Sequence, residues 1–383
     1  MMPEPARHLH FVQSIEPLQG GGLGRAALEL HHAFIQQAAT SSLVATHGSE
    51  PQARNDLSVR EFRRAGPAML YFSPDLRAAS APLVQGADIV HAHGLYTMAH
   101  WMLGSAARRQ DRALVYHVHG FFEPWILARS RARKRLVHGL FEDANFKHAR
   151  LWRALTSKEA EQIRAQGITA PIVVAANGID LAAFDATSEA IASSPFAVKS
   201  RRRMLFLARL HPKKGLGLLI PAWARVRQEA RDWELVIAGP DELGHLAEAQ
   251  SLVKTHELEN EIRFTGAVTG ADKLALLRSA DAFILPSHSE GFSVAILEAM
   301  ACRVPVAATH ACNFPELDTE GGGWLCQAEP EAVTKMLIQT LSTSDSERRD
   351  RGLAARRLVE QRYTWPSIAR TILDACATHC RFG

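Results

Sequence analysis

The chain has 383 residues, of which 47% are apolar and 22% are charged, and its formal net charge is +4 at pH 7. A chain of this length most often forms two domains, and the composition excludes a disordered protein, which would lack the apolar side chains for a core. No run of about 18 apolar residues is present, so the sequence predicts no membrane-spanning helix.

Two further features bear on where the protein works. Residues 1–8 are polar and lead directly into an apolar segment, which is not the pattern of a secretory signal. The five cysteines are scattered and lack the paired spacing of a metal site. We therefore expect reduced thiols in a cytoplasmic protein.

Strand-like and helix-like segments alternate along the chain, which is the pattern of parallel sheets covered by helices. In the first half we expect a helix over residues 23–37 and strands over residues 9–15, 43–45, 89–91, 114–116 and 172–174. In the second half we expect strands over residues 204–208, 235–237, 262–264, 282–285 and 306–308, and a last helix over residues 365–376. The pattern predicts an α/β protein with Rossmann-like domains at residues 1–190 and 200–364.

Four glycines lie between the first predicted strand and its helix, at positions 20, 21, 22 and 24. Glycine permits positive φ and close backbone approach, so a phosphate or a hydroxyl could reach the N–H groups of Gly21 and Gly22. The alternative is a dinucleotide site. However, the order Gly-Gly-Gly-Leu-Gly differs from the Gly-x-Gly-x-x-Gly fingerprint, and no acidic residue ends a second strand about twenty residues later.

Histidines follow two neighbouring predicted strands of the first half. A single histidine in such a place is usually a hydrogen-bonded core residue, whereas four of them favour a functional cluster. Zinc is one alternative, because His-x-His pairs can chelate a metal. Gly94 and Gly120 argue against zinc, because they would interrupt the extended strands that point both members of a pair to one face. The four are His91, His93, His117 and His119.

Basic residues are concentrated in a predicted helix of the first half. They form either a solvated helical face or a surface that attracts anionic lipid headgroups or the pyrophosphate of an acceptor. The segment lacks the aromatic residues and the recognisable fold of a nucleic-acid binder, so we expect no nucleic-acid partner. The cluster comprises Arg129, Arg131, Arg133, Lys134 and Arg135.

Two basic residues follow the first predicted strand of the second half. Arg209 leaves the carboxyl end of this strand, and Lys214 precedes the next helix. Ligands of open α/β sheets bind outside these carboxyl ends, and guanidinium and ammonium groups both pair with phosphate oxygens. Together they could neutralise a leaving diphosphate. The chain has no Asp-x-Asp pair that would hold a divalent ion there, so we expect neither a metal nor another cofactor.

Two acidic residues bracket the segment after the predicted strand at residues 282–285. Glu290 lies in a turn, and Gly291 is expected to open a helix that contains Glu298. At about 1.5 Å rise per residue the two carboxylates are roughly 12 Å apart, which is too far to share one proton. The spacing matches the two ends of a nucleotide sugar, with its diphosphate at the helix N-terminus. Two ordinary helix-surface glutamates are the alternative.

This combination resembles the donor site of family 4 retaining glycosyltransferases, which have the two-domain GT-B fold. The resemblance depends mainly on Arg209 and Lys214 followed by the Glu290-x₇-Glu298 element. Ala208 stands where the family often has glycine, and both residues are small. The likeness extends from about residue 9 to residue 376 and includes the glycine run near residue 20 and segments at residues 88–93, 117–120, 177–180, 238–241 and 264–266.

The resemblance implies a retaining hexosyltransferase that uses a nucleoside-diphosphate sugar. In such an enzyme Arg209 and Lys214 stabilise the leaving diphosphate. Glu298 binds the ribose and Glu290 binds the sugar hydroxyls, while His119 hydrogen-bonds the transferred sugar. The other donor-binding residues implied are Gly21, Gly22, Gly291, Phe292 and Ser293, of which Ser293 is also expected to cap the helix.

The resemblance also assigns work to the domains. The N-terminal domain is expected to bind the acceptor, the C-terminal domain the donor, and the last helix, within residues 365–383, is expected to cross back to the first domain. We expect the acceptor to be a glycan or a lipid-linked molecule of surface polysaccharide biosynthesis. The basic cluster would then make peripheral contact with the inner face of an anionic membrane.

Three other functions stay open at this point. A sugar-nucleotide 2-epimerase of the same architecture would release a free epimerised sugar without an acceptor. A non-catalytic binder would hold a nucleotide sugar or a glycan and turn over neither. A nicotinamide oxidoreductase would bind its dinucleotide at the glycines of the first half. The sequence does not distinguish GDP-mannose, UDP-glucose and related donors.

Overall fold

The computed structural model describes residues 6–49, 51, 56–123 and 142–380. The chain divides into two compact units, residues 1–178 with 365–383 and residues 179–364. Residues 179–190, which the sequence analysis grouped with the first half, thus belong to the second unit. The basic cluster at residues 129–135 lies outside the described residues.

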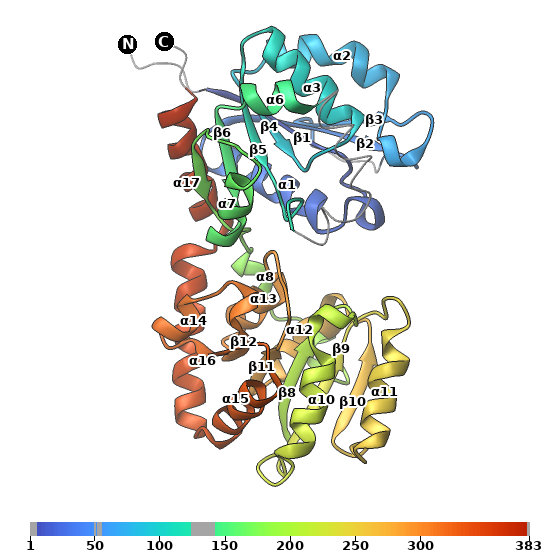
Figure 1. Ribbon diagram of the computed structural model, residues 1–383, viewed down its shortest axis with the longest axis vertical. Coiled ribbons are helices and arrows are strands. Elements are labelled where there is room, and N and C mark those ends of the chain that lie inside the picture. Colours follow the sequence, from blue (N-terminus) through green and yellow to red (C-terminus); the bar gives the residue numbers. More distant parts are fainter. Residues whose placement is uncertain (1–5, 50, 52–55, 124–141, 381–383) are drawn as a thin grey trace. The chain divides into compact units, whose positions relative to one another are not determined.

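The N-terminal unit contains a parallel sheet in which seven strands are described, in the order β3-β2-β1-β4-β5-β6-β7. Helices α1 and α17 pack against each other on one face, and α2, α3 and α6 cover the other (Figure 1). The strands are β1 (Arg7–Val12), β2 (Thr40–His47), β3 (Val59–Arg63), β4 (Ile89–His93), β5 (Ala113–His117), β6 (Leu151–Ala154) and β7 (Ile172–Val174). The helices are α1 (Pro17–Gln36), α2 (Pro74–Gln85), α3 (Met98–Arg109), α6 (Asp143–His148), α7 (Ser157–Arg164) and α17 (Trp365–His379), with the 3₁₀ turn η1 (Ala68–Leu70).

The C-terminal unit repeats this plan with six described strands in the order β10-β9-β8-β11-β12-β13. Helix α10 packs against α11 and α15, whereas α13 packs against α12 and α16, so helices form a layer on each face. The strands are β8 (Arg202–Leu207), β9 (Trp233–Ala238), β10 (Ile262–Gly266), β11 (Ala282–Leu285), β12 (Val306–Thr309) and β13 (Gly323–Cys326). The helices are α8 (Leu181–Asp185), α9 (Glu189–Ala192), α10 (Leu216–Arg225), α11 (His245–Thr255), α12 (Gly270–Ser279), α13 (Val294–Ala301), α14 (Glu316–Thr319), α15 (Pro330–Ser342) and α16 (Asp345–Arg362), with η3 (Pro212–Lys214) and η4 (His310–Cys312).

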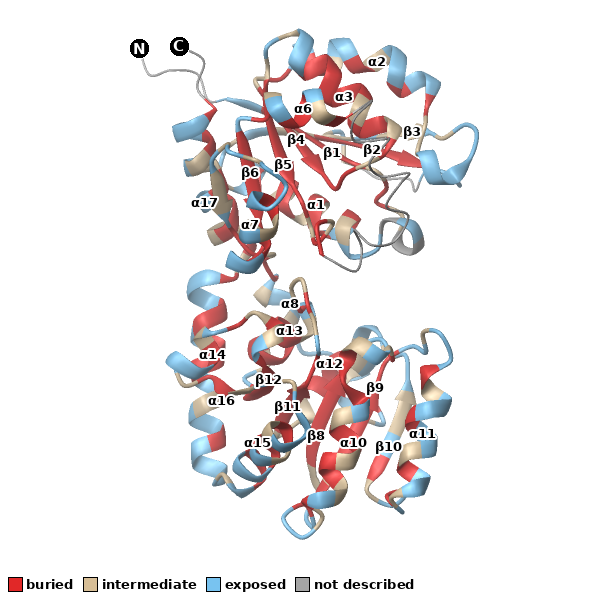
Figure 2. Ribbon diagram, in the orientation of Figure 1, coloured by how far each residue is buried: buried red, intermediate tan, exposed pale blue. Residues whose placement is uncertain are grey.

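The predicted α/β class is confirmed, and both sheets are parallel throughout their described strand pairs. Figure 2 shows that the central strands of each sheet are buried. Parallel strands are covered on both faces and therefore usually read as apolar runs. Strand β11 follows this rule, as does β8 after its two initial arginines, whereas β1 and β4 carry histidines inside an otherwise apolar core.

Each sheet has one point where the strand order reverses direction. In the N-terminal unit it lies between β1 and β4, and in the C-terminal unit between β8 and β11. Ligands of such sheets bind outside the carboxyl ends of the strands at this point. The loops that follow these four strands contain most of the site residues that the sequence predicts. No helix among the described residues is long and apolar enough to cross a bilayer.

Candidate functional site

The loop after β8 is held against the loop after β11 by a glycine. Gly215 has φ +80°, and a Cβ at this position would lie 2.0 Å from the carbonyl oxygen of Pro286. Only glycine fits such an approach. The backbone N–H of His288 also donates to the carbonyl oxygen of Lys213, over 2.8 Å. The two loops are thereby fixed together at the reversal point of the C-terminal sheet.

This contact brings Lys214 and Glu290 into a buried ion pair. The Lys214 Nζ lies 2.5 Å from Glu290 Oε1, and the two side chains are 11% and 6% exposed. The Ser287 hydroxyl donates to the same carboxylate oxygen over 2.7 Å. The Asn313 side chain donates to the Glu290 carbonyl over 2.7 Å. The structure thus joins two predicted site residues that are 76 positions apart in the sequence.

Arg209 lies at the carboxyl end of β8 but faces another partner. Its Nη1 donates to Glu242 Oε1 over 2.8 Å, and the arginine side chain is 57% exposed. Glu242 follows β9, so the guanidinium is directed toward the neighbouring strand end. Nearby His211 has a lowered pKa, first because of burial, with Lys213 and Arg209 adding positive charge and Glu242 opposing them. The contact between Arg209 and a diphosphate stays a prediction.

The helix after β11 begins later than the sequence predicts. Helix α13 starts at Val294, not at Gly291, because the chain is still extended at Ser293 (φ −93°, ψ 103°). Ser293 occupies the N-cap position, but its side chain makes no capping hydrogen bond, so the expected cap is not formed. Phe292 instead packs against Phe314, with the ring centroids 4.9 Å apart.

Glu298 lies inside α13 and is buried. Its Oε1 lies 2.7 Å from Nζ of Lys273, a residue of α12 that the sequence analysis did not single out. The lysine side chain is 26% exposed, so this pair is closer to solvent than Lys214–Glu290. Each of the two predicted glutamates therefore has a lysine partner. In the sequence, Glu290 precedes the start of α13 and Glu298 follows it.

The glycine run of the N-terminal unit lies inside a broken helix and not in a long loop. Helix α1 begins at Pro17 and is interrupted at Gly21, which has φ +51° and ψ −144°. No atom of the described residues would lie within 4 Å of a Cβ at Gly21 or Gly22, so this part of the structure leaves the backbone open on that side. At Gly24 a Cβ would lie 2.3 Å from the carbonyl oxygen of Ser14, so this glycine permits the helix to pack on the turn after β1.

Five histidines of β1, β4 and β5, together with His119 just after β5, form two hydrogen-bonded rows across the N-terminal sheet. In the first histidine row, the ring nitrogens of His8 and His91 are 2.9 Å apart, and those of His91 and His117 are 3.0 Å apart. In the second histidine row, the ring nitrogens of His10 and His93 are 3.0 Å apart, and those of His93 and His119 are 3.3 Å apart. The rows stack on each other, with ring centroids 4.4 Å apart for His10 and His91 and 4.1 Å apart for His93 and His117.

These rows correct the argument about strand ends. Gly94 does not interrupt β4, which runs through His93, so His91 and His93 do point to one face. Strand β5 ends at His117, and His119 follows in the left-handed region with φ +52°. Its ring still lies over that of His117, with centroids 6.3 Å apart. The sequence analysis also missed His8 and His10, although His8-x-His10 repeats the spacing of the two later pairs.

Two groups of side chains have donor atoms close enough to hold a metal among the described residues. They are His93, His117 and His119, and the set His31, His32 and Asp56, whose candidate ligand atoms lie within 4.8 Å of one another in each group. In the first group both ring nitrogens of His93 and of His117 already have hydrogen-bond partners. Mutual hydrogen bonding therefore accounts for this group without a metal.

Burial keeps these imidazoles neutral. It lowers the pKa of His93, His117 and His119 well below the usual 6.5, and the positive charge of Arg153 adds to the effect. Arg153 of β6 is itself buried and donates from Nε to the carbonyl oxygen of Ala175 over 2.8 Å. Its Nη1 lies 3.4 Å from Nδ1 of His117. A buried arginine thus closes the first histidine row.

The turn that carries His119 is fixed by a buried carboxylate. Glu159, in the first turn of α7, accepts hydrogen bonds from the backbone N–H groups of Gly120 and of Leu155, the latter over 2.5 Å. Burial raises the pKa of Glu159 above its usual value, against these hydrogen bonds. One pattern could have indicated this residue, the Thr156-x-x-Glu159 capping motif, and Thr156 does cap α7.

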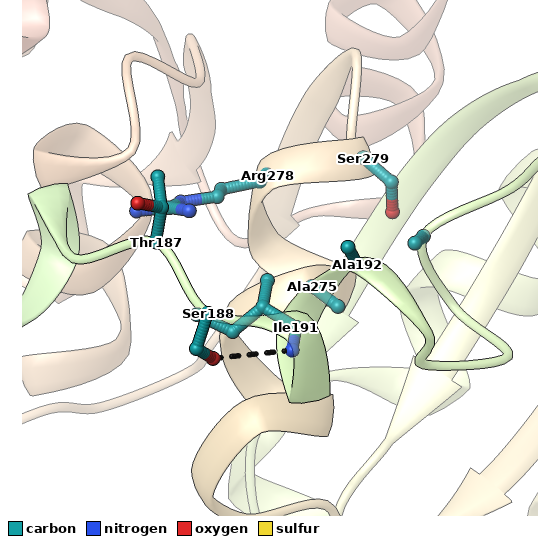
Figure 3. Close-up of a pocket in the computed structure, with 8 residues that line it drawn as sticks. Thr187, Ser188, Ile191, Ala192, Ala275, Arg278 and Ser279 are labelled. Atoms are coloured by element: carbon teal, nitrogen blue, oxygen red, sulfur yellow. Dashed lines mark hydrogen bonds between the residues drawn. The ribbon is translucent and has the colours of Figure 1, made fainter.

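A separate pocket of about 290 Å³ lies in the C-terminal unit near the amino ends of its strands (Figure 3). It is formed by the segment after α8 and by the last turn of α12, where Arg278 extends toward Thr187. Arg278 Nη2 donates to the carbonyl oxygens of Phe184 and Ala186 over 2.6 and 2.7 Å. Because α12 begins beyond the carboxyl end of β10 and runs back, its last turn lies at the amino ends of the strands. The pocket is therefore not part of the Lys214–Glu290 site.

Each unit is thus a doubly wound parallel sheet with polar groups near the reversal point, and the chain is a two-domain α/β protein. Two family models match consecutive parts of the chain. The model described as Glycosyltransferase Family 4 matches residues 20–183, and the model described as Glycosyl transferases group 1 matches residues 188–357. The chain belongs to this family of glycosyltransferases, which confirms the resemblance seen in the sequence.

Known relatives and solved structures agree with this assignment. The chain is 28% identical over 321 residues to a D-inositol 3-phosphate glycosyltransferase of Kineococcus radiotolerans, covering 75% of this chain and 70% of the relative. It is 28% identical over 293 residues to a glycogen synthase of Mycobacterium tuberculosis, covering 74% of this chain and 66% of the relative. HepE of Anabaena, solved in complex with UDP, has a TM-score of 0.77 at 21% identity, covering 97% of this chain and all of HepE. This likeness shows the GT-B fold.

Proposed function

We propose that this protein transfers a hexose from a nucleoside-diphosphate sugar to a hydroxyl of a glycan or lipid-linked acceptor, with retention of anomeric configuration. The observation that supports this function most directly is the buried Lys214–Glu290 pair at the reversal point of the C-terminal sheet. It provides an ammonium group for a phosphate and a carboxylate for sugar hydroxyls within one crevice. The C-terminal unit is the proposed donor-binding domain, and the N-terminal unit binds the acceptor.

The proposed chemistry depends on stabilising the leaving group. Arg209 and Lys214 offset the negative charge that develops on the diphosphate as the glycosidic bond breaks. The backbone N–H groups of Gly291 and Phe292 and the first turn of α13 add donors for the same oxygens. Glu298, which Lys273 holds at 2.7 Å, binds the ribose hydroxyls. The acceptor hydroxyl loses its proton to a leaving phosphate oxygen, so no protein base is required.

The N-terminal unit contributes His119 and the open backbone at Gly21 and Gly22. His119 hydrogen-bonds a hydroxyl of the transferred sugar, and the glycine N–H groups approach the donor's phosphates. Surface polysaccharide synthesis is the proposed setting. A putative colanic acid glycosyltransferase of Escherichia coli is 30% identical over 180 residues, covering 45% of this chain and 41% of the relative.

The test uses the purified protein with a panel of nucleotide sugars that starts from UDP-glucose and GDP-mannose. UDP-glucose comes first because HepE has been solved with it. We expect the parent to release the nucleoside diphosphate from one donor and to form a product whose anomeric configuration matches the donor. Arg209→Ala should lower turnover about 10²- to 10³-fold, as removal of one charge-stabilising donor does.

Arg225→Ala is the matched control for Arg209→Ala. Arg225 pairs with Glu331 over 2.9 Å and is 51% exposed, so the arginine resembles Arg209 in exposure and in the length of its ion pair. It lies in the last turn of α10, away from the strand carboxyl ends. Equal turnover in the two variants would remove Arg209 from the site. A free epimerised sugar would indicate a 2-epimerase, and donor binding without any turnover would indicate a non-catalytic binder.

A further inference from the structure

An arginine at one end of the first histidine row determines which ring nitrogens in this row donate hydrogen bonds and which accept them. A guanidinium only donates hydrogen bonds, so Arg153 Nη1 donates to His117 Nδ1. His117 must then carry its proton on Nε2 and donate to His91 Nδ1. His91 in turn carries its proton on Nε2 and donates to His8 Nδ1. All three rings of this row are therefore Nε2–H tautomers.

The second histidine row has no such arginine and has two different ends. At one end, His10 Nε2 is buried and has no hydrogen-bond partner among the described residues. At the other end, the Nε2 of His119 is held by Nδ1 of His93, and its own Nδ1 has no partner among the described residues. A buried N–H without an acceptor is rarer than an acceptor without a donor. This favours the direction in which His10 Nδ1 donates to His93 Nε2 and His93 Nδ1 donates to His119 Nε2.

The His119 backbone has an uncommon conformation, and among the described residues its side chain is restrained by a single hydrogen bond. His119 and Gly120 are both in the left-handed region, with φ +52° and +83°. A non-glycine residue in this region is uncommon and persists only where the surroundings fix it. Glu159 fixes the backbone through the N–H of Gly120, but the only hydrogen bond to the imidazole among the described residues comes from His93.

We propose that His93, supported by His10, is a positioning residue that holds the His119 ring as the Nδ1–H tautomer and leaves Nδ1 as the nitrogen that meets the sugar. This inference rests on the proposed function, in which His119 binds the transferred sugar. It gives the second histidine row a task that the first row lacks. At the end of the first row, His117 Nδ1 already accepts from Arg153, whereas His119 Nδ1 at the matching end of the second row has no partner among the described residues. His119 is then a hydrogen-bond donor to a sugar oxygen.

The charged and titratable groups around His119 come from four elements. They are His93 of β4, His117 of β5, Arg153 of β6 and Glu159 of α7, with Glu123 in the turn that follows Gly120. Arg153 disfavours a second positive charge on the imidazole, whereas the two carboxylates favour one. In His93→Phe the His119 ring loses its hydrogen bond and can turn toward solvent and the two carboxylates. The His119 imidazole should then gain a proton more readily than in the parent.

The experiment reads the tautomer of His119 directly, in the full chain without any ligand. Long-range nitrogen–proton NMR spectra of uniformly ¹⁵N-labelled protein distinguish Nδ1–H, Nε2–H and doubly protonated rings, and His119→Gln identifies the signal. In the parent we expect one neutral Nδ1–H tautomer from pH 8 to about pH 5.5. In His93→Phe we expect mixed tautomers and protonation that begins near the usual pKa of about 6.5.

Two further variants keep the test decisive. His91→Phe is the matched control, since His91 lies in the same strand, is equally buried and stacks on His10 as His93 stacks on His117. It should destabilise the unit to a similar extent and leave the His119 signal unchanged. His93→Asn offers an amide where His93 has Nδ1 and should restore the single tautomer. An unchanged His119 in His93→Phe, or an equal change in His91→Phe, would overturn the proposal.

Turnover of the donor identified above gives a second readout. His93→Phe should lower kcat about tenfold or more with little change in KM, because a misplaced group costs rate more than binding. Its kcat should also fall below about pH 6.5, where the parent is flat, while His91→Phe stays within about twofold to threefold of the parent. If no nucleotide sugar is turned over, the proposed function fails while the NMR result still decides the role of His93. An unchanged NMR signal with active enzyme would end this inference alone.

Discussion

The two units share a strand order but bury different kinds of side chain in their central strands. In the N-terminal sheet, His10 of β1 lies in register with His91 of β4. At the corresponding place in the C-terminal sheet, Leu205 of β8 lies in register with Phe283 of β11. One sheet therefore has imidazoles where the other has an apolar pair. The same topology accepts both because the imidazoles satisfy one another's ring nitrogens instead of being left unpaired.

The difference extends to the site residues. In the C-terminal unit the charged site residues lie in the loops and helices that follow the strands, as the pairs Lys214–Glu290 and Lys273–Glu298. In the N-terminal unit polar groups run from the centre of the sheet to its carboxyl edge, where His119 lies. A polar network inside a core is stable only while every member keeps its protonation state. The N-terminal unit should therefore be the more sensitive of the two to pH.

The largest expected effect is a loss of stability in the N-terminal unit as the pH falls below about 6.5. Burial lowers the pKa of His8 and His100 to about 4 and lowers that of His91, His93 and His117 well below the usual 6.5. Below pH 6.5 the unfolded chain binds protons that the folded unit does not, so stability falls by about 1.4 kcal/mol per pH unit for each histidine that stays neutral. At pH 5 several kcal/mol should be lost.

Two buried acids work in the opposite direction without reversing this result. Burial raises the pKa of Glu142 to about 7 and also raises that of Glu159, so both become more favourable to folding as the pH falls toward 4.5. Two groups cannot offset five. Hydrogen exchange corrected for its intrinsic pH dependence should show protection in β1 and β4 falling between pH 7 and pH 5. Protection in β8 and β11, which contain no histidine, is the internal control, and a parallel loss there would contradict the comparison.

A smaller effect is expected from breaking the buried ion pair of the C-terminal unit. Lys214→Met leaves the Glu290 carboxylate buried, with the Ser287 hydroxyl as its one remaining side-chain partner among the described residues. An unpaired buried charge should lower the free energy of unfolding by about 3 kcal/mol. The double variant Lys214→Met/Glu290→Met should recover most of this stability, because neither charge is then buried alone. Both variants should lose transfer activity.

The outer pair supplies the comparison. Lys273→Met removes the partner of Glu298, but the lysine is 26% exposed and water can replace part of the interaction. We expect a loss of about 1 kcal/mol or less. Thermal unfolding of the three variants and the parent measures both differences. Equal losses for Lys214→Met and Lys273→Met would show that the Lys214 pair is not more buried in solution than its neighbour.

Much of this architecture could be predicted because apolar runs mark the strands of a doubly wound sheet. Strand β11 was predicted with its observed bounds, residues 282–285. Strands β3, β6 and β13 were missed. Strand β3 lies at the sheet edge, and its partly buried and exposed positions do not form an apolar run. Strand β6 contains Arg153, whose buried charge is offset by carbonyl oxygens that no local pattern reveals.

The sequence could predict only those parts of the site that are formed by residues close together in the chain. The Glu290-x₇-Glu298 spacing was visible, but the start of α13 at Val294 depends on how residues 291–293 pack, including Phe292 against Phe314. The partners Lys273 and Glu242 come from other elements, so spacing does not indicate them. The histidine rows were half predicted. The first predicted strand was placed from residue 9, which left His8 outside it and hid the third His-x-His pair.

The smaller of the two losses expected at the Lys214–Glu290 site tests whether the loop contact that creates this site is as tight as the glycine implies. Gly215→Ala puts a Cβ 2.0 Å from the Pro286 carbonyl oxygen and forces a non-glycine residue to φ +80°. The loops must separate, so we expect about 2 kcal/mol of lost stability and weaker donor binding. Gly217→Ala is the matched control, two residues on and exposed, with no atom within 4 Å of a Cβ.

Gly217 lies in the first turn of α10, so alanine there should be neutral or should stabilise by up to about 1 kcal/mol. Thermal unfolding and titration of UDP followed by calorimetry separate the two variants. If Gly215→Ala and Gly217→Ala had the same unfolding temperature and the same affinity for UDP, the two loops would be far enough apart to accommodate a Cβ at position 215. The Lys214 ammonium would then not be fixed by the backbone, and the contrast between a rigid polar edge in one unit and a polar core in the other would lose its structural basis.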